Sequence, residues 1–445
     1  TALGYRAYSR GSATSAATAD YNTAIGTYTL YSNQSGASNV AVGHSAMQEN
    51  TTGGSNTAVG ASALFANTTG VRNTAVGQAA GIALTTGTDN TLLGQDAGDS
   101  ITTGLSNTAV GSETLQATTT GSYNTAVGQR SMETNSTASN NTAVGWGSLT
   151  ANTTGTQNTA IGRSALAANT TANYNTAVGY LAASAVTTGT QNTVVGRNAL
   201  STATTANYNT VMGYTAGQAI TTGGYNVAVG HGALDACTTG GVNTAVGSSA
   251  MGSGVTTGDD NTCIGTAAGF NISSGSNNLM LGHDAGRTGS PGGLMTTQVN
   301  TIVLGDENIG ACNIQTDWTI ASDARDKTDF TALDLGLDFV KALAPVTYKW
   351  DKRSKYGDKE ADDYDLSAQT PDGTHKEDWL DIGFKAQDVL ALEEAAGYKI
   401  ADKRNLTVSL SGDEKQYGLQ YSKFVPILVK AIQELAAEIE TLKGE

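Results

Sequence analysis

Few residues of this chain have the type and spacing that chemistry needs, and the densest group is Ser322-Asp323-Ala324-Arg325-Asp326-Lys327. This hexapeptide combines a hydroxyl group, two carboxylates and two cations. In isolation such a segment is typical of a helix N-cap followed by a charged first turn. A chemical role therefore depends on the sequence around it.

Carboxylate pairs are the second candidate for chemistry, because two carboxylates in a cleft can hydrolyse a glycosidic bond. Upstream of residue 300 the close pairs are Asp96 with Asp99 and Asp259 with Asp260. Both lie in a uniform repeat that offers no obvious cleft, which disfavours a glycosidase.

Metal and cofactor motifs are not found in the sequence. Cys237, Cys263 and Cys312 have no metal-ligand spacing, and we predict three free thiols. There is no Walker loop, no His-Glu-x-x-His and no convincing nucleophile elbow. We therefore expect no metal site and no cofactor.

The elements that position these residues come mainly from a repeat. The pentapeptide Asn-Thr-Ala-Val-Gly, or a near variant, recurs at intervals of 17 residues. Slipped copies follow at Asn261, Asn278 and Asn300, and an incomplete copy at 2–4 precedes the rest. The regular copies begin at Asn22, Asn39, Asn56, Asn73, Asn90, Asn107, Asn124, Asn141, Asn158, Asn175, Asn192, Asn209, Asn226 and Asn243. Such a period predicts a mainly β fold, a parallel β-solenoid or β-roll with one coil per repeat.

Each repeat reads as a short strand, Thr-Ala-Val, that ends at a Gly, followed by Thr-Thr-Gly as a turn. Gly permits the positive φ of tight corners, and Asn tolerates it better than most residues. Four residues after the strand's Gly stands an apolar anchor, as in Met47, Leu64, Leu115, Leu149, Leu166, Leu200 and Leu234. Where that anchor is Gly81, Gly98 or Gly217, an apolar residue appears three positions later, as Leu84, Ile101 or Ile220. We predict one aliphatic anchor per coil, supplied from either of two corners.

Some seventeen coils with strands about 4.8 Å apart predict a rod roughly 80 Å long. A single solenoid of small side chains should be marginally stable, and association of several chains would add burial. The repeats resemble the head repeats of trimeric autotransporter adhesins and those of phage fibres. That resemblance implies a homotrimer.

One corner column stands out in this rod. The residue after the repeat Gly is aromatic or cationic in six successive coils: Trp146, Arg163, Tyr180, Arg197, Tyr214 and His231. Aromatic faces and Arg are favoured at binding surfaces, so the column is a candidate receptor contact. Alternatively, the six side chains stack to stabilise neighbouring coils or the trimer seam.

Charge divides the chain near residue 300. The first 300 residues contain no lysine, whereas the remainder is rich in Lys, Asp and Glu. The formal net charge of −15 disfavours nucleic acid as a partner, because phosphate binding needs clustered Lys and Arg. No apolar run is long enough to span a bilayer, so no membrane insertion is expected.

Beyond residue 300 the hexapeptide resembles the Ser-Asp-x-Arg-x-Lys signature of the intramolecular chaperone of phage endosialidases and tail spikes, the S74 peptidase family. The resemblance continues through 342–350, 382–389 and 421–443. It implies a solenoid shaft at 1–300, a connector at 301–321 and an α+β chaperone and self-cleaving domain at 322–445. It further implies that residues 351–378 form extended arms that embrace the shaft.

In this family the domain templates trimerisation and then cleaves the chain before the signature Ser. The resemblance therefore implies cleavage between Ala321 and Ser322, with Ser322 as nucleophile and Lys327 as base. Asp323 and Arg325 would orient the site. The activity would be a single-turnover serine endopeptidase with no external substrate.

Two features of the motif affect this reading. Asp326 stands where the family usually has an apolar residue and Phe330 where it usually has Ile, and an acid beside Lys327 opposes loss of its proton. A spacing of five residues places Ser322 and Lys327 on different faces of a helix. The motif must therefore lie in a turn or take its partner from another chain.

The chain ends in an amphipathic pattern. Apolar residues alternate by three and four, which is the seam of a short coiled coil: Val425, Leu428, Ile432, Leu435, Ile439 and Leu442. An amphipathic helix packed on its own domain is the alternative.

Together these features predict a virion tail fibre that binds a host receptor and carries a self-processing chaperone. It would be made in the host cytoplasm and assemble as a homotrimer with other tail proteins upstream. Its partner would be a host surface receptor, for which a glycan is one candidate. A glycan-degrading tail spike and a bacterial trimeric surface adhesin are the alternatives, and the charged terminal helix disfavours the adhesin, since its anchor would be outer-membrane β-strands.

Overall fold

The computed structural model describes residues 1–8, 19–315, 318, 320–359, 361 and 363–444. Residues 316, 317 and 319 of the predicted connector lie outside this set. Contacts divide the chain into two units, Thr1–Leu279 and Met280–Glu445, which are described separately.

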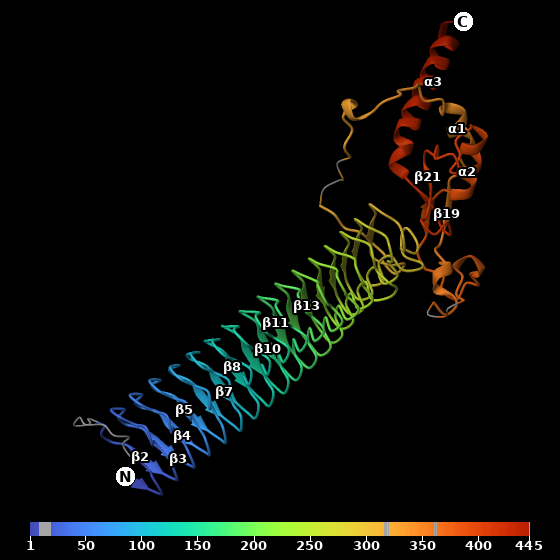
Figure 1. Cartoon of the computed structure of the whole chain (residues 1–445). Coiled ribbons are helices and arrows are strands. Elements are labelled where there is room, and N and C mark those ends of the chain that lie inside the picture. The colour runs from blue at the N-terminus through green and yellow to red at the C-terminus, as the bar shows by residue number, and fades with distance from the viewer. Residues whose placement is uncertain (9–18, 316–317, 319, 360, 362, 445) are drawn as a thin grey trace. The chain divides into compact units, whose positions relative to one another are not determined.

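The first unit is a parallel β-solenoid of about 15 turns, which confirms the predicted fold class. Successive strands, drawn as stacked arrows in Figure 1, pair in parallel, as Thr142 does with Thr159 and Thr159 with Thr176. The strands are β1 (Ala2–Leu3), β2 (Thr23–Ile25), β3 (Val40–Val42), β4 (Thr57–Val59), β5 (Thr74–Val76), β6 (Thr91–Leu93), β7 (Thr108–Val110), β8 (Thr125–Val127), β9 (Thr142–Val144), β10 (Thr159–Ile161), β11 (Thr176–Val178), β12 (Thr193–Val195), β13 (Thr210–Met212), β14 (Val227–Val229), β15 (Thr244–Val246) and β16 (Thr262–Ile264). Strand β17 (Leu279–Leu281) follows at the boundary of the unit.

The repeat asparagine has a different role from the one that we predicted. It does not take up a positive φ; the residue before it does, as Tyr123 at 60° and Tyr174 at 62°. The asparagine side chain is instead buried and bonds to the neighbouring coils. Asn141 Nδ2 donates to the Gly155 carbonyl at 2.9 Å, and Asn141 Oδ1 accepts from the Asn158 backbone N–H at 2.9 Å. Repeated coil after coil, these bonds form an internal asparagine column.

The repeat glycine is required by geometry. Gly179, for example, has φ 139°, and a Cβ atom there would lie 2.4 Å from the Gly196 carbonyl oxygen of the next coil. Side chains other than hydrogen are therefore excluded at this corner.

The predicted anchors form the core of the solenoid. Leu64, Leu115, Leu149, Leu166 and Leu200 are fully buried, and so are Leu84, Ile101 and Ile220, which follow the coils with glycine at the anchor position. The two-corner compensation is therefore confirmed.

Leu92 supplies a compensation that the sequence did not suggest. It replaces the central Ala of its strand and is fully buried. A Cβ atom at Gly81 or Gly98 would lie 2.7 or 2.9 Å from the Leu92 methyl groups. Both glycines therefore make room for one enlarged strand residue.

Two further positions test the repeat assignment. Cys237 is buried at the repeat position that holds asparagine in some coils, such as Asn152, and an aliphatic residue in others, such as Ile220, and its thiol donates to the Gly240 carbonyl at 3.4 Å. Burial raises the pKa of Cys237 and of Cys263 to about 12, while Cys312 is exposed; all three are free, as predicted. The last copy is shifted by one residue, because β18 (Ile302–Leu304) places Thr301, and not Asn300, at the position of the repeat asparagine.

The second unit contains β18 and a small α/β domain. Its helices are α1 (Leu337–Ala342), α2 (Ala386–Ala395) and α3 (Phe424–Gly444), with short 3-10 turns η1 (Ala324–Asp326), η2 (Arg353–Lys355), η3 (Leu366–Ala368) and η4 (Tyr421–Lys423). Two two-stranded antiparallel sheets pair β19 (Val346–Tyr348) with β20 (Asp381–Gly383) and β21 (Val408–Leu410) with β22 (Tyr417–Leu419). No helix among the residues that the structure describes is long and apolar enough to cross a membrane.

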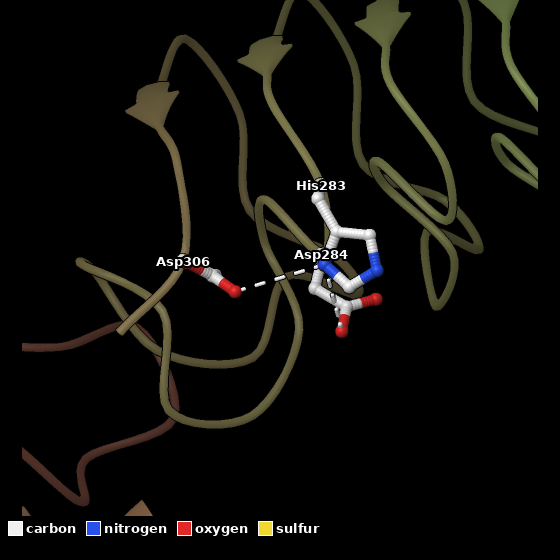
Figure 2. Close-up of side chains that lie close together, drawn as sticks. All are labelled: His283, Asp284 and Asp306. Atoms are coloured by element: carbon white, nitrogen blue, oxygen red, sulfur yellow. Dashed lines mark ion pairs between the residues drawn. The ribbon is translucent and has the colours of Figure 1, made fainter. Parts of the chain in front are cut away.

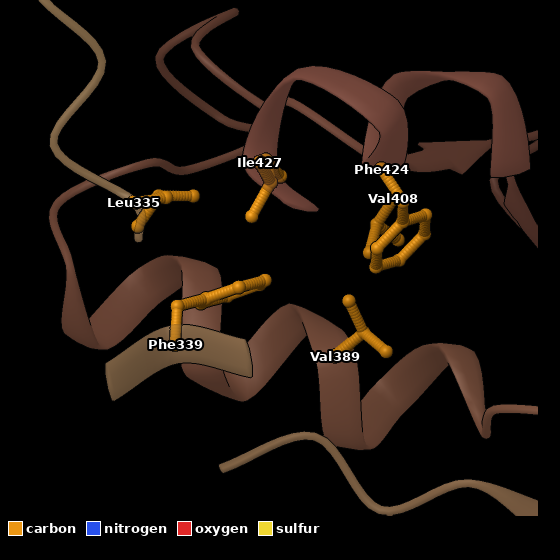
Figure 3. Packing of buried hydrophobic residues seen from close by; sticks show 6 residues of the cluster. All are labelled: Leu335, Phe339, Val389, Val408, Phe424 and Ile427. Carbon is orange, nitrogen blue, oxygen red and sulfur yellow. The ribbon is translucent and has the colours of Figure 1, made fainter. Parts of the chain in front are cut away.

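The core of this domain joins all three helices. Leu335, Phe339, Val389, Val408, Phe424 and Ile427 converge in it, as Figure 3 shows. Two acids fix the helices: buried Glu393 of α2 accepts from the Thr407 N–H at 2.6 Å, and Glu434 of α3 accepts from the Leu337 N–H at 2.7 Å. The bond from Leu337, together with Lys430, holds the pKa of Glu434 below its usual value.

Helix α3 has two apolar faces. Phe424, Ile427 and Ala431 pack into the domain, as the alternative of an amphipathic helix predicted. The predicted coiled-coil seam lies outside that contact and is exposed along its length, from Val425 (58%) to Leu442 (72%). The single chain therefore leaves a helical apolar stripe without a cover.

The asparagine column predicts a specific sensitivity. Asn141→Ala should destabilise the solenoid by about 1–3 kcal/mol, because the buried Asn158 N–H loses its acceptor, whereas the Gly155 carbonyl keeps the Asn152 amide as a donor. Thermal and denaturant unfolding would measure the loss. Asn140→Gly is the matched control, since Asn140 is exposed at φ 62° and Gly adopts that angle freely. Equal stabilities for the two variants would contradict the structural role of the column.

Candidate functional site

The signature hexapeptide forms a tight turn at the start of the second unit's folded domain. Asp323 caps η1, because its Oδ1 accepts from the Arg325 N–H at 2.9 Å. The turn carries the chain back on itself, and Lys327 Nζ lies 2.5 Å from Ser322 Oγ. Of the two arrangements left open by the spacing, a turn or a partner from another chain, the structure has the turn.

Arg325 is directed at Asp323. The guanidinium Nη2 lies 2.6 Å from Asp323 Oδ2, and this pairing lowers the pKa of Asp323. The charge of Arg325 is therefore largely compensated within the turn. Asp323 and Arg325 shape the turn, and only Ser322 and Lys327 meet as a hydroxyl and an amine.

The environment limits what this pair can do in a single chain. A lysine accepts the proton of a serine only after losing its own, which needs burial or an uncompensated cation nearby. Ser322 and Lys327 are both exposed, as is Ala321, whose carbonyl precedes the serine. The geometry of a nucleophile and its base is present, and a cover that excludes water would complete the site.

A comparison with family models gives the turn a context. Residues 322–398 match the Peptidase_S74 model, described as the chaperone of endosialidase. The matched segment begins at Ser322 and ends just after α2. Residues 399–444 lie beyond it, yet Val408, Phe424 and Ile427 share the core with Phe339 and Val389. The folded domain therefore extends past the matched segment to the end of α3.

Neither the curated proteins nor the solved structures include a match to this chain.

Residues on the two sides of Ser322 are joined by non-covalent contacts within the second unit. Three lysines downstream hold the segment 307–308: Lys352 Nζ donates to the Glu307 carbonyl at 2.8 Å, Lys359 pairs with the Glu307 carboxylate and Lys355 donates to Asn308 Oδ1. The Glu307 side chain is only 7% exposed. One of these lysines, Lys359, forms an ion pair with the nearly buried Glu307 carboxylate, and the other two donate to neutral oxygens of the same segment.

A second contact lies at the β21–β22 turn. Asp413 Oδ2 accepts from the Leu294 N–H at 3.0 Å, and the Gly412 N–H donates to the Gly292 carbonyl at 3.2 Å. A Cβ atom at Gly293 would lie 2.3 Å from Asp413 Oδ1, so this approach needs a glycine. The domain after Ser322 therefore contacts the segment 292–308 at two places.

The sequence did not identify Glu307 or Asp413, because both act through partners far away in the chain. The resemblance placed arms at 351–378, and the lysines at 352–359 fall in that region. The lysine-rich composition of this region was the available signal, but it gave no indication of the acidic target.

The six-residue corner column is a continuous stack in the first unit. Arg163 lies 5.0 Å from the Trp146 ring and 5.9 Å from the Tyr180 ring, and Arg197 lies 5.8 Å from Tyr180. Arg197 also lies 5.5 Å from the Tyr214 ring, which stacks on His231 with centroids 5.3 Å apart. The ring faces are turned toward neighbouring coils, an arrangement that stabilises the stack of coils. A receptor contact by this column stays a prediction, and it would use ring edges.

The carboxylate pairs have local partners. Asp259 Oδ1 accepts from the Gly241 N–H of the preceding coil at 2.7 Å, and Asp99 bonds to Ser100 at 3.1 Å. These bonds tie the carboxylates into the coil structure. They give no specific support to glycan hydrolysis.

The dyad predicts an all-or-none effect on processing. Wild-type protein should be found as two pieces cut between Ala321 and Ser322, whereas Ser322→Ala and Lys327→Met should stay whole, since one lacks the nucleophile and the other the base. Denaturing electrophoresis and intact mass would measure this. Lys376→Met, an exposed lysine of the same domain, is the control and should cut as wild type does. Cutting in Ser322→Ala, or an uncut wild type, would exclude this chemistry.

Proposed function

We propose that this chain is the distal part of a homotrimeric phage tail fibre whose C-terminal domain assembles the solenoid and then cuts itself off before Ser322. The observation that carries the proposal is that two features begin at the same residue. The segment that matches the endosialidase chaperone begins at the residue whose Oγ lies 2.5 Å from a lysine amine.

The cleavage would be an intramolecular acyl transfer. Ser322 Oγ attacks the carbonyl carbon of Ala321 while Lys327 takes the hydroxyl proton. The peptide C–N bond then breaks, and the proton passes to the leaving nitrogen of Ser322. Water hydrolyses the resulting ester, which leaves a carboxylate on Ala321 and a free amine on Ser322.

Association of chains would provide the cover that the dyad lacks. On α3 the stripe containing Ile432 and Leu435 is exposed, and a bundle of three such helices would bury it. Such a trimer would bring three copies of the domain together, and contacts between them could exclude water from the turn. Cleavage would then follow assembly.

The solenoid presents a second apolar stripe that supports association. The third residue of each strand projects away from the core and is partly exposed, as Ile25 (38%), Ile161 (40%) and Met212 (48%). Water-exposed aliphatic side chains repeated along the whole unit are unfavourable for a monomer. Packing against two further copies would bury them.

The contacts between the domain after Ser322 and residues 292–308 support the chaperone role. A domain that holds the final coil in place would fix the geometry from which parallel pairing can propagate, because each coil is a template for its neighbour. The finished fibre would act at the virion tail, with a host surface receptor as its partner.

Assembly is tested on α3. In the Ser322→Ala background, which keeps the chain whole, the protein should be a trimer by light scattering. Leu435→Asp should shift the population to monomers, because it places a charge in the apolar seam. Glu438→Gln, a polar position of the same helix, should leave the trimer intact. A monomeric Ser322→Ala parent would overturn the proposal.

The same contacts predict how the two pieces of the chain separate after cleavage before Ser322. After cleavage, residues 322–445 should stay bound at low salt and dissociate as salt rises, since the lysine contacts with 307–308 are electrostatic. Glu307→Gln should release the fragment at lower salt than wild type does, with Glu394→Gln, an exposed acid of the same domain, as control. Gel filtration of the cut protein at increasing salt measures the release. A release that is independent of salt, or unchanged in Glu307→Gln, would contradict this role for Glu307.

A further inference from the structure

The corner that carries the aromatic stack in earlier coils carries different side chains where the repeat ends. His283 follows Gly282, and Asp306 follows Gly305, so both occupy the post-glycine corner of their strands. Asp284 is the next residue after His283. Figure 2 shows the carboxylates of Asp284 and Asp306 near the His283 imidazole, with dashed lines for the two ion pairs.

The distances suit a single metal ion. His283 Nδ1 lies 3.4 Å from Asp284 Oδ2 and 3.7 Å from Asp306 Oδ2, and one ligand atom from each residue lies within 4.8 Å of the other two. Tetrahedral zinc with bonds of about 2.1 Å places its ligands about 3.4 Å apart. The two separations from His283 Nδ1 are therefore close to those between the ligands of one zinc ion, and the two carboxylates lie within 4.8 Å of each other.

Both carboxylates are held in place by further donors. Asp306 accepts from the Asn308 N–H at 2.9 Å and from Asn308 Nδ2 at 2.6 Å, and Asn308 accepts in turn from Lys355. Asp284 Oδ1 accepts from Arg287 at 3.1 Å and leaves Oδ2 facing the imidazole. Orientation of first ligands by outer hydrogen bonds is a regular property of protein metal sites.

The cluster is open to solvent on the side of His283. The Asp306 side chain is 8% exposed, whereas that of His283 is 65% exposed. An ion could therefore enter from solvent past the imidazole and keep water in its remaining positions.

We propose that His283, Asp284 and Asp306 bind one divalent transition-metal ion per chain, with Zn²⁺ the preferred ion. One imidazole and two carboxylates form a donor set that suits zinc and its neighbours better than calcium, which prefers six to eight oxygens. The ion would tie the end of β17 to the end of β18, where the 17-residue spacing has broken down. This site is independent of the cleavage chemistry.

Without a metal, the same geometry is an ion pair between a protonated imidazole and two acids. The two readings differ in their response to added metal. An ion pair takes up no zinc, whereas a metal site binds it with a defined stoichiometry.

The test uses the full chain with Ser322→Ala, which prevents cutting, and Cys312→Ser, which removes the exposed thiol. After treatment with a chelator, calorimetry with ZnCl₂ should give one Zn²⁺ per chain, and the melting temperature should rise with added zinc. His283→Gln and Asp306→Asn should abolish both effects. His44→Gln, at an exposed histidine that follows the repeat glycine Gly43 in the first unit, should leave them unchanged.

A second measurement distinguishes loss of the metal site from misfolding of the variant. Co²⁺ bound by the parent should show a visible d–d spectrum that His283→Gln loses while keeping the parent's circular dichroism. Absence of zinc uptake by the parent would overturn the proposal. So would equal uptake by His283→Gln, or calcium uptake in preference to zinc.

Discussion

The buried amide of the repeat asparagine is the interaction on which the solenoid depends. A coil with only three residues of strand has few ladder hydrogen bonds, and its corners would otherwise bury unpaired carbonyl and N–H groups. The asparagine bonds to both: Asn141 reaches the Gly155 carbonyl of the next coil and accepts from Asn158. Since the amide must meet its counterpart coil after coil, the repeat length is fixed at one value over most of the unit.

A coil that depends on a buried asparagine amide buries little apolar surface. Each coil contributes a strand residue, usually Ala, and one larger anchor, and the remaining aliphatic strand residues face outward. The same deficit recurs in α3, where one face is buried against Phe339 and the other is exposed. The exposed apolar residues of the solenoid and of α3 are consistent with the proposed assembly of several chains, and so is the exposed Ser322–Lys327 pair. Burial of apolar surface and activation of the lysine would then arise from the same event.

Particular residues show which features of the fold and of the site could be predicted from the sequence. The period and the anchors predicted the solenoid and its core, including the exchange of Leu64-type anchors for Leu84 and Ile101. The role of the asparagine was missed, because its known tolerance of positive φ offered a simpler explanation than a side-chain column. Leu92 was missed because its effect on Gly81 and Gly98 runs between coils. At the site, the spacing of Ser322 and Lys327 left two arrangements open, and only the capped turn at Asp323 selects one.

The charge asymmetry of the chain acquires a structural meaning at the junction of its parts. The first 300 residues carry no lysine and only 11 carboxylates, whereas the remaining residues carry 28 carboxylates. Acids reappear at Asp306 and Glu307, where Lys355 reaches Asn308 and Lys359 reaches Glu307. Within the second unit, the lysine-rich segment 352–359 therefore has an acidic partner at Glu307. This pairing connects the residues just after β18 to the domain after Ser322, while the asparagine column determines how each coil of the first unit follows the one before.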